Sequence, residues 1–130
     1  MRERLIIGTR KSALALWQSG FVKGALESAF PGLVVELLHI VTTGDKTQES
    51  NVPMPAIGGK GLFTAELEDA LIRNEIDLAV HSLKDLPTVL APEFTVGAIP
   101  PRGPVADVLV SRSGQKREEL PAGDRKSTRL

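Results

Sequence analysis

The sequence predicts an α/β domain with a largely parallel sheet, and three observations support this prediction. Short apolar runs typical of buried strands begin at residues 5, 33 and 76. Segments with helical periodicity lie between them, and the resulting strand–helix–strand order favours parallel strands covered by helices. Because such crossovers are right-handed, the carboxyl ends of the three strands are expected at one edge of the sheet.

The first strand is expected at residues 5–8, where three apolar side chains precede a glycine. Apolar residues then recur at helical spacing, which predicts an amphipathic helix over residues 13–29. Ser12 is placed to cap this helix, and the Pro-Gly pair at residues 31–32 ends it. Trp17 is expected in the core beneath the helix.

A second strand is expected over residues 33–41, with His39 in a structural role, and a second helix over residues 62–73. Residues 46–61 are polar, contain Pro and Gly, and lack a clean period, which predicts a loop. Long loops in compact domains are usually functional or disordered, so this one is expected to be a mobile lid. Further strands are expected at residues 76–82, 94–99 and 107–111.

Composition excludes several classes of protein. Sixteen basic and sixteen acidic residues cancel, so nothing favours bulk attraction to nucleic acid or to a membrane surface. The chain has no cysteine, which rules out disulfides, thiolate metal sites and cysteine nucleophiles, and no metal site is expected. No apolar run approaches a membrane span and no signal-peptide pattern precedes the first strand, so a cytoplasmic protein is expected.

Polar clusters follow all three predicted strands, at residues 9–12, 42–45 and 81–85. A fourth cluster, GGKG at residues 58–61, leads into the second helix. In open α/β sheets, ligands bind outside the carboxyl ends of the strands. Helix starts there add free backbone N–H groups, which suit anions. The sequence therefore predicts a binding site at this edge.

Three cations, Arg10, Lys60 and Lys84, are expected to converge at that site, which suggests a small ligand with several carboxylates or phosphates. Asp85 would be an isolated acid among these cations. There it should stay ionised, and it could stabilise a positive charge that develops on a substrate.

Each feature also has a plain structural explanation. Ser12 is a helix cap in many such sequences, and the GGKG segment alone matches neither a P-loop nor a dinucleotide fingerprint. The adjacent Lys84 and Asp85 would also fit a surface ion pair of little energetic value. His81 is more often a hydrogen-bonded structural residue than a catalyst in this setting.

Four motifs in order and in register resemble those of porphobilinogen deaminases. They are GTRKSALALWQ at residues 8–18, TTGD at 42–45, GGKGLF at 58–63 and AVHSLKDLP at 79–87. The resemblance implies a domain like type 2 periplasmic binding proteins within a three-domain, monomeric enzyme. It also implies head-to-tail condensation of four porphobilinogen molecules into hydroxymethylbilane, with release of ammonia, in tetrapyrrole synthesis. The acetate and propionate groups of porphobilinogen agree with the polycarboxylate ligand suggested above.

The resemblance also implies roles for individual residues. Asp85 matches the catalytic aspartate that interacts with pyrrole nitrogens. The residues that match substrate contacts are Arg10, Ser12 and the loop lysine Lys60. The residues that match cofactor contacts are Ser82 and Lys84. The implied cofactor is a dipyrromethane primer, bound to a cysteine that would lie outside these 130 residues.

Some segments depart from the family pattern. Ala56 stands where many members have a second loop lysine, and residues 101–107 form an atypical hinge. The resemblance divides the chain into most of a first domain at residues 1–100, a crossover and the start of a second domain at 101–123, and a non-native tail at 124–130. The family's later arginines and cofactor cysteine are not among these residues, so the chain is expected to be an N-terminal fragment that is inactive alone.

A different class of function stays open beside the enzyme. The same kind of fold serves non-catalytic solute-binding or effector-sensing domains for acidic small molecules. Such a domain needs the cations but has no need of a buried acid. Asp85 next to Lys84 therefore favours the enzyme.

Overall fold

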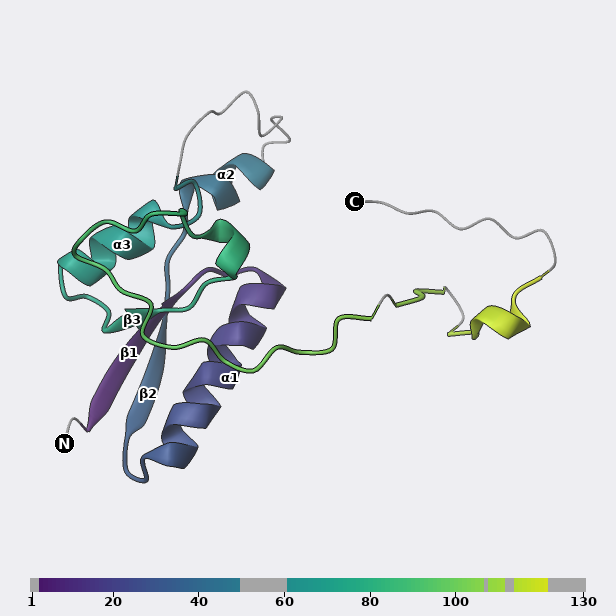
Figure 1. The fold of residues 1–130 in the computed structure, drawn as a ribbon, viewed down its shortest axis with the longest axis horizontal. Helices are drawn as coiled ribbons and strands as arrows, with labels where there is room; N and C mark the ends of the chain where they lie inside the picture. The colour runs from purple at the N-terminus through teal and green to yellow at the C-terminus, as the bar shows by residue number, and fades with distance from the viewer. Residues whose placement is uncertain (1–2, 50–60, 107, 112–113, 122–130) are drawn as a thin grey trace. The chain divides into compact units, whose positions relative to one another are not determined.

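A computed structural model describes residues 3–49, 61–106, 108–111 and 114–121 (Figure 1). The chain divides into two compact units, Met1–Ala98 and Ile99–Leu130. The elements of the first unit are β1 (Arg4–Thr9), α1 (Ala13–Ala29), β2 (Val34–His39), α2 (Thr43–Glu49), α3 (Ala65–Ile72), β3 (Leu78–Ala79) and the 3₁₀ turn η2 (Leu83–Asp85). In the second unit, the described residues form one 3₁₀ turn, η3 (Arg117–Glu119).

The first unit is an α/β structure built on a parallel sheet of strand order β2-β1-β3, as the sequence predicts. Ile7 lies at the centre of β1, opposite Leu37 and Leu78, and its side chain is fully buried. The third strand lies where it was expected but is shorter. Backbone bonds from Asp77 N to Ile6 O (2.9 Å) and from Val80 N to Gly8 O (3.4 Å) continue the pairing on either side of it.

The first helix begins and ends as predicted. The Ala15 backbone N–H donates to Ser12 Oγ at 3.3 Å, which caps α1. The helix ends at Ala29, and Gly32 follows with a φ of +93°. Figure 1 shows α1 lying alongside the strands.

The prediction that Trp17 lies in the core is wrong for the described part of the chain. Its side chain is 66% exposed, and it stacks on Phe21 with ring centroids 6.0 Å apart. The stripe of α1 that faces the sheet is centred instead on buried Ser19, whose hydroxyl donates to Thr9 Oγ1 at 2.7 Å. The apolar periodicity thus predicted the helix correctly, but α1 has two apolar stripes and the sheet covers only the one with Leu16, Val22 and Leu26.

Other boundaries differ from the expectation. Residues 46–49 belong to α2 and not to a loop, because Thr42 Oγ1 accepts the Asp45 N–H and starts a short helix. The rest of the expected lid, residues 50–60, lies outside the described residues. The next helix starts at Ala65 because residues 61–64 form a turn in which Gly61 has a φ of +82°.

The two later strands were wrongly predicted. Described residues in 94–99 and 108–111 pair with no strand. Ile99, Val108 and Val110 in these segments are more than four-fifths exposed. An apolar run becomes a strand only where another strand offers an edge. His39 is the exposed last residue of β2. None of the described helices is both long enough and apolar enough to cross a bilayer.

Candidate functional site

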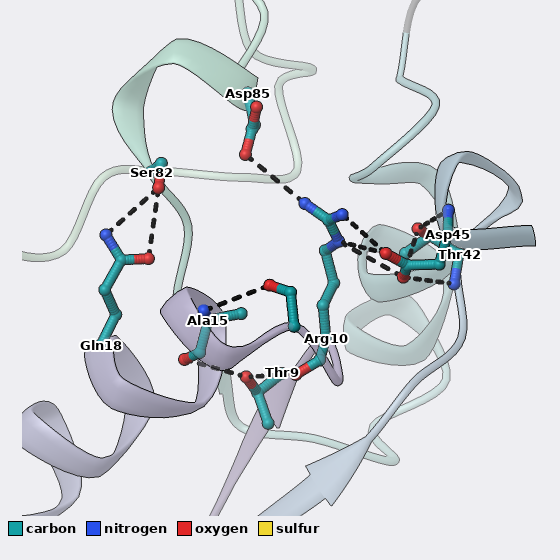
Figure 2. A network of polar contacts seen from close by, with 9 residues as sticks. Thr9, Arg10, Ala15, Gln18, Thr42, Asp45, Ser82 and Asp85 are labelled. Carbon is teal, nitrogen blue, oxygen red and sulfur yellow. Dashed lines mark hydrogen bonds and ion pairs between the residues drawn. The ribbon is translucent and has the colours of Figure 1, made fainter. Parts of the chain in front are cut away.

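The three strand ends meet at one edge of the sheet, as the parallel topology predicts. Arg10 follows β1, the turn at Thr42 follows β2 and leads into α2, and residues 80–85 follow β3. Figure 2 shows the Arg10 side chain between Asp45 and Asp85. The site is therefore assembled from segments that are far apart in the sequence.

Arg10 is the centre of this arrangement. Its Nε lies 3.0 Å and its Nη2 2.6 Å from Asp45 Oδ1, so two nitrogens on one edge of the guanidinium meet one carboxylate (Figure 2). The guanidinium carbon also lies 4.1 Å from the centre of the Phe63 ring, a cation–π contact. The side chain is only 13% exposed, so these contacts fix its direction.

Asp45 is held in turn by Thr42, which ends the segment after β2. Its Oδ2 accepts the Thr42 backbone N–H at 3.2 Å and the Thr42 hydroxyl at 2.8 Å. Burial by itself would raise the pKa of Asp45, but the hydrogen bonds from Arg10 and Thr42 outweigh it and lower the pKa. Asp45 is therefore a carboxylate at neutral pH.

Asp85 lies on the other side of Arg10, at the end of η2. Its Oδ2 is 3.7 Å from Arg10 Nη1, which is an ion pair but too long for a hydrogen bond. Its side chain is 19% exposed. Among the described residues, Gly61 and residues 86–89 join Asp85 in lining a cavity of about 400 Å³. Asp85 thus borders space that a small molecule can enter.

His81 lies on the same segment. Burial lowers its pKa below the ordinary value, and the nearby charge of Arg10 acts in the same direction. The carboxylates of Asp85 and Glu68 oppose this shift without cancelling it. The imidazole is therefore neutral near pH 7.

Ser82 faces Gln18 of α1 (Figure 2), and its Oγ lies 3.1 Å from Nε2 and 3.2 Å from Oε1 of that amide. This contact ties the end of β3 to the first turns of α1. Ser12 uses its hydroxyl to cap α1, and Lys84 is exposed on η2. Lys60 lies outside the described residues.

The sequence predictions missed three residues of the site: Gln18, Asp45 and Phe63. All three stand within the motifs quoted above, yet none was given a role. Asp45 offered a usable signal, because it is an acid after one parallel strand while Arg10 is a base after the neighbouring strand. The pairing of Arg10 with Phe63 had no such signal, because it depends on how α2 and α3 pack.

The described site is also less cationic than the sequence suggested. One guanidinium lies between two carboxylates, and Lys84 is exposed. Among the residues that the structure describes, no group of three or more His, Asp or Glu side chains is arranged to hold a metal ion. The site can thus offer Arg10 donors to an anion and the Asp85 carboxylate to an N–H group or a cation.

This fold is of the open α/β type, with charged residues at the carboxyl edge of a parallel sheet, where proteins of this class bind small molecules. The family model described as "Porphobilinogen deaminase, dipyromethane cofactor binding domain" matches residues 5–129. The chain therefore belongs to the porphobilinogen deaminase family, which confirms the resemblance seen in its motifs.

Individual relatives agree with the family model. The porphobilinogen deaminase of Syntrophobacter fumaroxidans is 52% identical over 129 residues, covering 98% of this chain and 41% of the relative. That of Chloroherpeton thalassium is 50% identical and covers 95% of this chain and 38% of its own length. That of Roseiflexus sp. is also 50% identical and covers 98% of this chain and 42% of its own length. The chain thus spans about two fifths of the length of the relatives that it matches.

Proposed function

We propose that this chain forms part of a transferase that joins four porphobilinogen molecules head to tail into hydroxymethylbilane, releasing ammonia, in tetrapyrrole biosynthesis. Membership of the porphobilinogen deaminase family supports the reaction. The observation that carries the proposal is the position of Asp85 at the sheet edge. This residue lines a cavity, and its carboxylate lies 3.7 Å from Arg10.

Asp85 is the catalytic residue in this proposal. As ammonia leaves the aminomethyl group of a porphobilinogen, positive charge develops on the pyrrole unit. A fixed carboxylate in a partly buried site stabilises such a charge far better than it would in water. Asp85 also accepts a pyrrole N–H, which orients the ring.

The other residues hold the carboxylates of the pyrroles. Arg10 has five N–H donors, and the contacts with Asp45 leave the Nη1 donors for a substrate carboxylate. We assign Ser12 and Lys60 to the substrate as well. Ser82 and Lys84 are assigned to the cofactor.

A dipyrromethane cofactor fits the donors that the described residues offer. The hydroxyl of Ser82 and the exposed ammonium of Lys84 suit its carboxylates, and Asp85 suits its pyrrole N–H groups. When bound, this group supplies the pyrrole end to which the first substrate adds. The chain contains no cysteine, so its own residues supply only non-covalent contacts to the cofactor.

We further propose that the first unit belongs to a domain of the type 2 periplasmic-binding-protein kind, with residues 1–100 forming most of that domain. Residues 101–123 then form a crossover to a second domain, and residues 124–130 are a non-native tail. The strand order β2-β1-β3 and the unit that ends at Ala98 support the fold and its boundary. We propose a monomeric cytoplasmic protein, by analogy with the family.

A chimera tests the function. Residues 1–123 of this chain replace the matching part of the Syntrophobacter fumaroxidans deaminase, and the product is supplied with porphobilinogen. We expect hydroxymethylbilane, detected directly or as uroporphyrin after cyclisation. The 130-residue chain alone should give none, because it spans only 41% of that relative.

Two variants sharpen this test. Asp85→Asn should lower the turnover of the chimera by about 10²–10³-fold, as expected when one charge-stabilising group is lost. Asp69→Asn, an exposed acid on α3, is the matched control and should leave turnover unchanged. A folded chimera that binds porphobilinogen without turnover would favour the solute-binding alternative, and near-normal turnover of Asp85→Asn would remove Asp85 from the mechanism.

A further inference from the structure

We propose that Asp45 is a positioning residue that keeps the Arg10 guanidinium from closing onto Asp85. Arg10 and Asp85 are then both free to contact the substrate, at different groups. The inference rests on the proposed function for its catalytic consequence. The part of the inference that concerns the position of Arg10 does not depend on that function.

The contacts of Arg10 are strongly unequal. Asp45 Oδ1 lies 2.6 Å from Nη2 and 3.0 Å from Nε, whereas Asp85 Oδ2 lies 3.7 Å from Nη1. A charge-assisted N–H···O bond is typically about 2.7–2.9 Å long. The guanidinium therefore stops short of a hydrogen bond with Asp85 and leaves its Nη1 donors available.

Asp45 is well placed to set the distance between Arg10 Nη1 and Asp85 Oδ2 because Asp45 is itself anchored. Its second oxygen accepts two hydrogen bonds from Thr42, a fully buried residue. The Phe63 ring lies against the guanidinium at 4.1 Å and restricts its movement further. Because the hydrogen bonds from Arg10 and Thr42 also lower the pKa of Asp45, its charge is present throughout the neutral range.

Without the charge of Asp45, the nearest carboxylate to Arg10 among the described residues is that of Asp85. Both side chains are at least four-fifths buried, so their attraction is only weakly screened. A guanidinium forms bidentate bonds with a carboxylate readily. Arg10 would then pair with Asp85, and each would lose its freedom to act on the substrate.

The first test is the position of Arg10 in the Asp45→Asn variant, which keeps the shape of the side chain and removes its charge. In a crystal structure of this variant of the chimera, we expect at least one Arg10 nitrogen within about 2.7–3.2 Å of an Asp85 carboxylate oxygen. An unchanged gap between Arg10 and Asp85 would overturn the proposal.

The second test is kinetic. In the chimera, Asp45→Asn should lower kcat by about tenfold or more, because Asp85 is neutralised by Arg10. In an Arg10→Gln background, the same change should leave kcat unchanged, because no guanidinium remains to close on Asp85. Glu36→Gln, which breaks the exposed ion pair between Arg4 and Glu36, is the control and should leave kcat unchanged in both backgrounds.

The outcomes separate three cases. An equal loss of kcat from Asp45→Asn in both backgrounds would mean that Asp45 only supports the fold, and would overturn the proposal. If Asp45→Asn does not fold, Thr42→Val serves as a second variant because it removes one donor to Asp45. It should move Arg10 toward Asp85 and lower kcat, each by less than is expected for Asp45→Asn. If the parent chimera shows no turnover, the proposed function fails, while the crystal structure still decides where Arg10 goes.

Discussion

Phe63 packs directly on Gly44, leaving no room for a side chain at that position. A Cβ on Gly44 would overlap the Cδ1, Cε1 and Cζ atoms of the phenyl ring. Gly44 lies in the first turn of α2, and its N–H donates to Leu62 O at 2.7 Å. The Arg10 guanidinium also contacts this ring, with its carbon 4.1 Å from the ring centre. The absence of a side chain at position 44 thus lets α2 approach the segment that supports the charged site.

Gly44→Ala is therefore expected to displace Phe63 and to lower the free energy of unfolding by about 1–3 kcal/mol, the usual cost of overpacking. Gly24→Ala is the matched control, since Gly24 lies within α1 with nothing near its missing side chain. Alanine there should raise stability by about 0.5–1 kcal/mol. Urea unfolding measures the free energy of unfolding of both variants. Equal changes in the two would contradict the packing argument.

His81 predicts how stability depends on pH. Burial lowers its pKa in the folded protein, whereas the unfolded chain titrates near pH 6.5. The unfolded state thus binds more protons in this range. The contribution of His81 to stability is complete above about pH 6.5 and is lost as the pH falls toward the lowered pKa.

The measurement is the free energy of unfolding across about pH 5 to 8, with and without His81→Gln. The parent chain should lose stability on the acid side, and the variant should lose less. His39→Gln, at the exposed end of β2, should follow the parent curve. If His81→Gln and the parent have parallel curves, the neutral, partly buried imidazole is not the cause.

The exposed stripe of α1 predicts poor solubility for the 130-residue chain. Leu14, Trp17 and Phe21 are 55%, 66% and 49% exposed and lie together along the helix. Apolar patches of this kind favour association. The double change Trp17→Arg and Phe21→Arg should reduce light scattering and leave the melting temperature nearly unchanged. A large fall in melting temperature would show that Trp17 is a core residue after all.

Two side chains of α1 block the outer edge of β2, and removing them is expected to open a second route to association. Lys23 Nζ lies 2.5 Å from Val35 O, and Glu27 Oε1 accepts the Val35 N–H at 3.0 Å. Two side chains of α1 thus occupy backbone groups that another strand would otherwise pair with. Lys23→Ala with Glu27→Ala should increase dimers or fibrils, measured by sedimentation and dye binding. Arg73→Ala with Glu75→Ala, which removes another surface ion pair, should not.

The sequence by itself determined the order of the first elements and the place of the site. Apolar runs and periodicity located β1, α1, β2 and, within a longer predicted segment, β3, because strand and helix periods are local properties of the chain. The parallel topology then placed Arg10 and Asp85 at one sheet edge. The motifs identified the family for the same reason, since they are contiguous in sequence.

Only the tertiary structure decided what each residue contacts. The pairing of Arg10 with Asp45, the contact of Phe63 with Gly44 and the exposure of Trp17 all depend on how separate elements pack. Strands predicted from residues 94–99 and 107–111 are absent from the described residues, because a strand requires a partner that local sequence does not specify. Local patterns indicate candidate elements, whereas neighbours in space decide which strands form and set the charge and geometry of the site.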